Sequence, residues 1–164
     1  MRNIILIGMP AVGKSTLGVI LAKTLGLQFV DTDLLIQKSQ GRLLQNIIDH
    51  DGIDRFLQIE ESVISDLELT GCVIATGGSV IYSEKAMDHL KKMGQVIYLH
   101  VTCEEIEKRL KNITTRGIVM GKGATLKDVY DKRVPLYKKY AETVIDCSGK
   151  DMEQSINTIL NHIL

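Results

Sequence analysis

The sequence has no tryptophan, two prolines and three cysteines among 164 residues, and its 20 lysines and arginines balance 20 acidic residues. This balance excludes the overall basic field that draws a protein to nucleic acid or to an anionic membrane. The longest apolar run, residues 4–9, is far shorter than the ~20 residues of a membrane-spanning helix. Cys72, Cys103 and Cys147 are widely separated without metal-ligand spacing, so we expect reduced side chains in a cytoplasmic protein.

What the sequence does contain fits one globular domain over residues 1–164, because 45% of its residues are hydrophobic and 24% are charged. We expect a monomer. Short β-branched runs alternate with longer amphipathic stretches, which predicts an α/β fold with a parallel sheet. Strands are expected at 2–7, 29–31, 72–75, 95–101 and 143–146. Helices are expected at 14–26, 83–93, 103–111, 125–141 and 151–163, with two or three more within 33–70.

A phosphate-binding loop lies between the first predicted strand and the first predicted helix. Residues 8–15 read Gly-Met-Pro-Ala-Val-Gly-Lys-Ser and match G-x-x-x-x-G-K-[ST]. The glycines let successive backbone N–H groups turn inward toward a phosphate, and the helix adds its positive N-terminal end. Lys14 is placed to reach the β- and γ-phosphates, and Ser15 to ligate Mg²⁺. We therefore expect a site for a nucleoside triphosphate, formed by Ala11, Val12, Gly13, Lys14, Ser15 and Thr16.

The remaining sequence favours a small-molecule kinase over other users of this loop. The N-K-x-D motif with which GTP-binding switches recognise the base is absent, and the chain is too short for a motor domain. Residues 112–124 are rich in glycine and threonine and contain Arg116, which predicts a mobile lid. A lid of this kind excludes water, so that ATP phosphorylates an acceptor and is not hydrolysed.

Motifs along nearly the whole chain resemble the shikimate kinase family. They are the loop at 8–16, Asp31-Thr32-Asp33, Gly52 with Phe56 and Glu60, Gly77-Gly78, Arg109, Arg116, and Arg133-Val134-Pro135-Leu136-Tyr137. The resemblance implies a three-layer P-loop kinase fold with a five-stranded parallel sheet. It also implies transfer of the ATP γ-phosphate to the 3-hydroxyl of shikimate, with an acceptor-binding helical region at about 33–61.

The resemblance also assigns roles to two aspartates and a glycine pair. Asp31 would enter the Mg²⁺ shell through water, and Asp33 would hold the acceptor hydroxyls and take the proton. Capping of the next helix is an alternative role for Asp33 that is compatible with catalysis. Gly77 and Gly78 would let the backbone approach the acceptor, or would form a simple turn.

Three arginines receive roles in the same way. Arg116 would stabilise charge during transfer, Arg109 would stack over adenine, and Arg133 would grip the acceptor carboxylate with its planar fork. For each of them the alternative is a solvated surface side chain. Lys14, Asp33 and Arg116 are the expected catalytic residues.

Three positions depart from the family pattern. The family has arginine where this chain has Leu57, a third glycine where it has Ser79, and proline where it has Gly117. Arg55 is two residues from position 57, about 200° around a helix, so it would point to nearly the opposite face. The sequence therefore leaves a second hypothesis open, a kinase for another polyol or cyclitol acceptor. A nucleotide-binding regulator without catalysis is a third.

Overall fold

The computed structural model describes residues 2–111 and 123–164. Its sheet has five parallel strands in the order β2-β3-β1-β4-β5. This arrangement confirms the predicted fold class, and each expected strand is present. The strands are β1 (Asn3–Ile7), β2 (Gln28–Asp31), β3 (Cys72–Ala75), β4 (Gly94–His100) and β5 (Thr143–Asp146).

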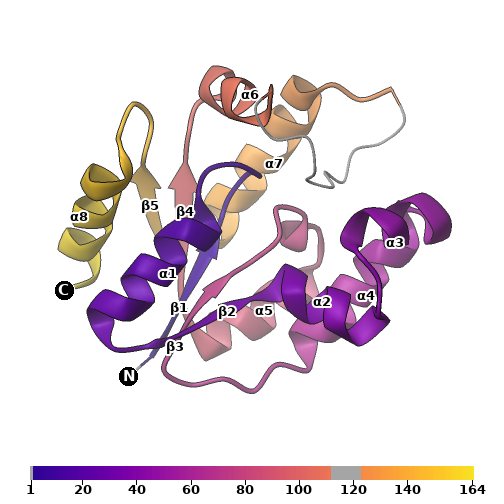
Figure 1. Ribbon diagram of the computed structural model, residues 1–164, viewed down its shortest axis with the longest axis horizontal. Helices are drawn as coiled ribbons and strands as arrows, with labels where there is room; N and C mark the ends of the chain where they lie inside the picture. Colours follow the sequence, from indigo (N-terminus) through magenta and orange to yellow (C-terminus); the bar gives the residue numbers. More distant parts are fainter. Residues whose placement is uncertain (1, 112–122) are drawn as a thin grey trace.

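Helices cover both faces of this sheet, with α1 and α8 on one face and α5 and α7 on the other (Figure 1). Three helices, α2, α3 and α4, fill the stretch for which two or three were expected. A short 3₁₀ helix, η1 (Val80–Tyr82), was not predicted, because a three-residue turn has no hydrophobic period of its own. The helices are α1 (Lys14–Leu25), α2 (Thr32–Gln40), α3 (Leu44–Asp51), α4 (Ile53–Ser65), α5 (Glu84–Met93), α6 (Cys103–Lys111), α7 (Leu126–Tyr140) and α8 (Met152–Ile163).

The main core surrounds the central strand β1, which is buried along its whole length. Continuous burial is expected for a parallel strand with helices on both faces, and it explains why the strand is an unbroken apolar run. Cys72 and Cys147 lie in this core, Cys103 is half-buried, and all three are free thiols. None of the helices in the described ranges is long and apolar enough to cross a membrane.

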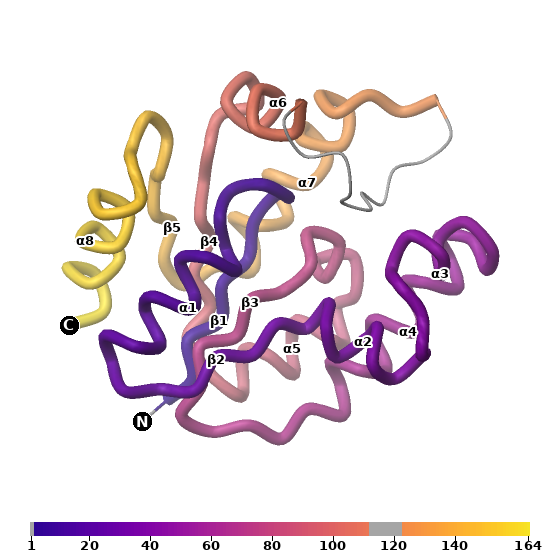
Figure 2. Tube along the Cα trace, in the orientation of Figure 1, coloured from indigo at the N-terminus to yellow at the C-terminus, as the bar shows by residue number. Residues whose placement is uncertain are grey.

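A second, smaller core holds α2, α3 and α4 together, through Ile36, Ile47, Phe56 and Ile59. These helices extend from the sheet on the side away from α8 (Figure 2). The small core fixes the position of α4 relative to α2. It therefore sets where side chains at 33 and 60 lie relative to each other.

The carboxyl ends of three neighbouring strands meet at one edge of the sheet. Ala75 at the end of β3 is paired with Leu6 of β1 and with Asp31 of β2. The phosphate loop, Asp31 and the segment after Ala75 therefore leave the sheet side by side. In open parallel sheets this edge is where ligands bind.

Candidate active site

The phosphate loop has the backbone conformation that its glycines allow. Gly13, directly before α1, has φ +98°, a value that L side chains rarely adopt. The Lys14 side chain is buried and its ammonium donates hydrogen bonds to the carbonyl oxygens of Gly8 and Met9, both at 2.8 Å. These bonds hold the lysine across the loop at the N-terminus of α1. Val12 is buried and Thr16 is exposed.

Ser15 and Asp31 contact each other across the gap between the loop and β2. The Ser15 hydroxyl donates to Asp31 Oδ2 at 2.8 Å, while Asp31 Oδ1 accepts a hydrogen bond from the Asp33 backbone N–H at 2.9 Å. Asp31 is thus the residue that caps α2, and Asp33 is not, which corrects the capping alternative considered for Asp33. Within the described residues no cluster of three or more histidine, cysteine or acidic side chains is placed to hold a metal ion. A hydroxyl and a carboxylate are nevertheless the oxygen ligands that Mg²⁺ takes when phosphates and water complete its shell.

One cavity of about 160 Å³ brings together the two halves of the predicted site. The phosphate loop supplies one side of this cavity, and the segments after β2 and β3 supply the other. A phosphate on the loop and an acceptor beside Asp33 would therefore share one space. The lining residues are Pro10, Lys14, Ser15, Asp31, Asp33, Thr76, Gly77 and Gly78.

Gly77 and Gly78 leave no room for a Cβ unless the neighbouring side chains shift. A Cβ at Gly77 would lie 2.7 Å from Asp33 Oδ1 and 3.0 Å from Glu60 Oε2. A Cβ at Gly78 would lie 2.8 Å from a guanidinium nitrogen of Arg133. The glycine pair is therefore more than a turn, because two carboxyl groups and one guanidinium group occupy the space that side chains at these positions would need.

Arg133 is 1% exposed, unlike the lysines near it on α7, so the solvated basic face considered from the sequence does not include it. Its Nε donates to the Tyr82 hydroxyl at 3.2 Å, and its guanidinium carbon lies 5.4 Å from the centre of that ring. Tyr137, one turn further along α7, donates to the carbonyl oxygen of Gly78 at 2.6 Å. These contacts fix the guanidinium beside the glycine pair.

Glu60 is a member of this cluster to which the sequence analysis gave no role. It is 2% exposed, and its Oε1 accepts a hydrogen bond from the Ser79 hydroxyl at 2.8 Å. Burial raises the pKa of Glu60 to about 7, an effect that the Ser79 hydrogen bond opposes. The sequence did contain a signal that Glu60 is buried: it lies four residues after Phe56, on the apolar face of an amphipathic helix.

Arg109 lies beside the phosphate loop. One guanidinium nitrogen donates to the Ala11 carbonyl oxygen at 3.1 Å, and the other pairs with Glu105 on α6 at 2.7 Å. This placement is compatible with a base stacked on the guanidinium face. Arg116, Gly117 and almost all of the expected lid at 112–124 lie outside the described residues.

Leu57 lies on the side of α4 that lines a second cavity, next to Glu60 and Ser79, whereas Arg55 does not. Leu57 lines a cavity of about 140 Å³ together with Glu60, Ser79 and Tyr82. Arg55 is exposed and donates to Gln58 at 3.3 Å on the outer surface of the helix. The 200° argument from the sequence therefore agrees with the structure, and Arg55 does not take the place of an arginine at 57.

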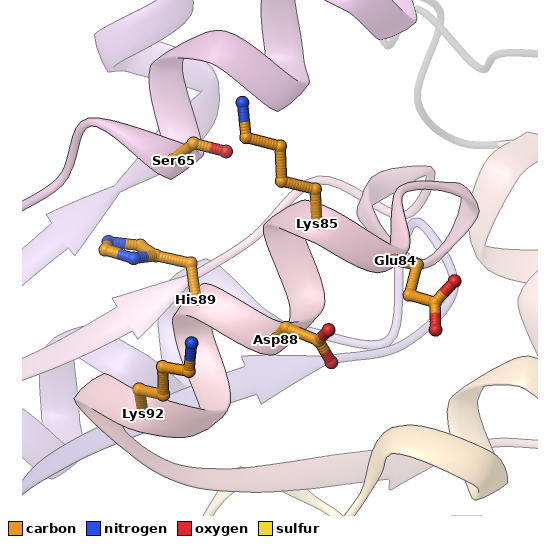
Figure 3. Close-up of a pocket in the computed structure, with 6 residues that line it drawn as sticks. All are labelled: Ser65, Glu84, Lys85, Asp88, His89 and Lys92. Atoms are coloured by element: carbon orange, nitrogen blue, oxygen red, sulfur yellow. The ribbon is translucent and has the colours of Figure 1, made fainter.

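A cavity of about 520 Å³ on α5 contains none of the predicted site residues. The residues that line it are Ser65, Glu84, Lys85, Asp88, His89 and Lys92 (Figure 3). Its histidine is held by the Leu67 carbonyl oxygen at 2.7 Å, and the carboxylates of Glu84 and Asp88 point away from that ring. Its charged side chains do not converge, so it has no arrangement suited to catalysis.

Comparison with known proteins agrees with this geometry. A family model described as shikimate kinase matches residues 10–164. The chain belongs to the shikimate kinase family. A shikimate kinase from Clostridium botulinum is 38% identical over 164 residues, covering 98% of this chain and 95% of the relative. One from Thermodesulfovibrio yellowstonii is 37% identical over 163 residues, covering 98% and 94%.

Solved shikimate kinases have the same fold. The structure of shikimate kinase from Acinetobacter baumannii in complex with shikimate superposes with a TM-score of 0.91 at 30% identity, covering 99% of this chain and 93% of that one. The enzyme from Aquifex aeolicus gives 0.82 at 29% identity, covering 97% and 94%. Family membership makes this chain an ATP-dependent kinase.

Proposed function

We propose that this chain transfers the γ-phosphate of ATP to the 3-hydroxyl of shikimate, a step that leads toward aromatic amino acids. The observation that carries the proposal is the shared cavity, with Lys14 and Ser15 on one side and Asp33 and Gly77 on the other. The buried Arg133 guanidinium next to Gly78 supports the proposal, because a guanidinium can bind a carboxylate through two hydrogen bonds and shikimate has a carboxylate.

The chemistry requires positioning and charge stabilisation. The acceptor oxygen forms a bond to the γ-phosphorus, the bond from that phosphorus to the bridging oxygen of ADP breaks, and Asp33 takes the hydroxyl proton. Lys14 and the loop N–H groups stabilise the negative charge on the phosphate oxygens. Arg133 holds the acceptor so that the reacting hydroxyl faces Asp33. Arg116 stabilises the negative charge that develops during transfer, and Arg109 stacks over the adenine of ATP, which are the roles expected from the sequence.

Mg²⁺ is part of the proposal. The residues that would hold it are Ser15, through its hydroxyl, and Asp31, through water. Their 2.8 Å contact supports this assignment, because it places two oxygen ligands together beside the phosphate loop. When bound, the metal supplies positive charge for the phosphate oxygens. We further propose that the enzyme acts as a monomer in the cytoplasm, a reducing compartment in which its three free thiols persist.

A different acceptor is the second candidate, and Leu57 is the observation that favours it. An aliphatic side chain lies next to Glu60 and Ser79, at the position where the family has a second cation for the carboxylate. Loss of one charged hydrogen-bond partner costs ~1.5–3 kcal/mol, or roughly 10- to 150-fold in affinity. A polyol or cyclitol without a carboxylate would not incur that loss.

Coupled measurement of ADP release with MgATP, with and without millimolar shikimate, distinguishes the candidates. We expect shikimate to stimulate release strongly. Absence of stimulation, in protein shown to bind ATP, contradicts the proposal. Stimulation by a cyclitol that lacks the carboxylate, but not by shikimate, would support the second candidate. If a single-turnover experiment detects no phosphoryl transfer to any acceptor, the result would support the third hypothesis, a nucleotide-binding regulator without catalysis.

A further inference from the structure

The two departures from the family pattern in the acceptor region converge on one carboxyl group. Leu57 lies three residues before Glu60 on α4, a spacing that places side chains on neighbouring turns of one helix face. Ser79 reaches the same carboxyl from the segment after β3, through the 2.8 Å hydrogen bond to Glu60 Oε1. Leu57, Glu60 and Ser79 also line one cavity of about 140 Å³.

The other oxygen of this carboxyl is buried and directed at the acceptor side of the site. Among the described residues, Glu60 Oε2 has no hydrogen-bond partner. It lies against Gly77, which also contacts Asp33 Oδ1. A buried carboxylate oxygen without a partner is costly, so a ligand hydroxyl that donates to it gains binding free energy.

We propose that Ser79 is a positioning residue for the acceptor: it holds Glu60 so that Oε2 accepts a hydrogen bond from an acceptor hydroxyl. In this chain Ser79 takes over the stabilisation of Glu60 that an arginine at position 57 would supply from the next turn of α4. The proposal rests on the proposed function, because it concerns the acceptor pocket of that reaction. It also relates the leucine at 57 to the serine at 79 in this chain.

The charges around Glu60 determine what removal of the serine hydroxyl does. Asp33 of α2 disfavours the Glu60 carboxylate and Arg133 of α7 favours it, and Tyr137 of the same helix interacts with it electrostatically. Ser79 donates to the ionised form, so Ser79→Ala favours protonation of Glu60. A protonated Glu60 at neutral pH is a weaker acceptor for a ligand hydroxyl.

The first experiment uses ligand-free protein with ¹³C-labelled glutamate carboxyls, with the Glu60 signal identified by its loss in Glu60→Gln. We expect Glu60 to titrate at higher pH in Ser79→Ala than in wild type. Ser62→Ala, a matched change at an exposed serine on α4, leaves the titration unchanged. Identical titration in Ser79→Ala and wild type would overturn the proposal, whatever the acceptor is.

The second experiment measures kcat/KM for shikimate from pH 6 to 9. We expect Ser79→Ala to lower kcat/KM roughly tenfold near pH 6.5, through KM, and to approach wild type near pH 9. A loss of the same size at every pH would indicate a merely structural role and overturn the positioning role. If wild type itself shows no shikimate-dependent ADP release, the proposed function fails, and the carboxyl titration still tests Ser79.

The third experiment adds Leu57→Arg to Ser79→Ala. A guanidinium one turn from Glu60 favours its ionised form, so the Glu60 titration returns to the wild-type pH or below. Leu57→Lys tests whether the planar fork is needed or a positive charge is enough. If Leu57→Arg leaves the Glu60 titration of Ser79→Ala unchanged, the link between positions 57 and 79 is wrong.

Discussion

The Ser15 hydroxyl donates a hydrogen bond to Asp31 Oδ2 at 2.8 Å, and this contact joins the phosphate loop to the end of β2. The other oxygen of Asp31 caps α2 through the Asp33 N–H. One carboxylate therefore links the proposed metal position to the helix that carries Asp33. A cation that binds at Ser15 and Asp31 is thereby connected to the position of the proposed base.

Asp31→Asn should weaken the response to metal. Asparagine also caps helices, so α2 remains intact, but the charge that favours Mg²⁺ is lost. We expect a roughly tenfold higher Mg²⁺ concentration for half-maximal ADP release, with ATP binding retained. Asp88→Asn, at an exposed position on α5, is the control. An unchanged Mg²⁺ requirement would contradict the assignment of Asp31.

Asp33→Asn should lower kcat by about 10²–10⁴-fold, the range for loss of a positioned general base. The amide keeps the size of the carboxyl beside Gly77, so the fold and nucleotide binding are retained. Single-turnover phosphoryl transfer and equilibrium ATP binding together separate the chemical step from binding. A rate within twofold of Asp66→Asn, an exposed control, would exclude Asp33 as the base.

The fold was predictable because its signals are local. Four of the five strands contain adjacent β-branched residues, β2 being the exception, and the phosphate loop is recognised from fixed spacing over eight residues. The strand order places Asp31 and Gly77 at the same edge, so their proximity follows once a parallel sheet is assumed.

The contacts made by Glu60 were not predictable in this way. Glu60 and Ser79 are 19 residues apart, and their hydrogen bond depends on how α4 packs against the segment after β3. The choice of Asp31 over Asp33 as the cap depends on backbone angles, and the sequence Asp-Thr-Asp does not reveal which of its two aspartates has the angles of a cap. The burial of Arg133 likewise depends on Tyr82, 51 residues away, and not on the lysine-rich composition of α7.

Gly18→Ala tests the packing of α1 on the sheet. Alanine favours the helix by up to ~1 kcal/mol, but a Cβ here would lie 2.6 Å from a ring carbon of Phe29. Overpacking typically costs ~1–3 kcal/mol, so we expect a net loss of about 1 kcal/mol in unfolding free energy. Urea denaturation of Gly18→Ala and of Gly18→Ala/Phe29→Leu measures it. The smaller side chain at 29 should remove the clash, and equal stability losses from Gly18→Ala in both backgrounds would rule out this contact as the cause.

Glu60 should make stability fall as pH rises through the neutral range. Its folded-state pKa of about 7 lies above its ordinary 4.5, so the native state binds the extra proton between these values. The contribution of this proton to the free energy of unfolding is fully present below pH 4.5 and is lost as pH passes 7, a change of about 3 kcal/mol.

Glu60→Gln has no carboxyl group at position 60 to titrate, so it does not undergo this loss. We therefore expect the unfolding free energy of Glu60→Gln to rise relative to wild type between pH 5 and pH 8. Urea denaturation across this range measures the effect, with Glu84→Gln as the exposed control. If the unfolding free energies of Glu60→Gln and wild type differ by the same amount at every pH, Glu60 is already ionised throughout the range and the prediction is wrong.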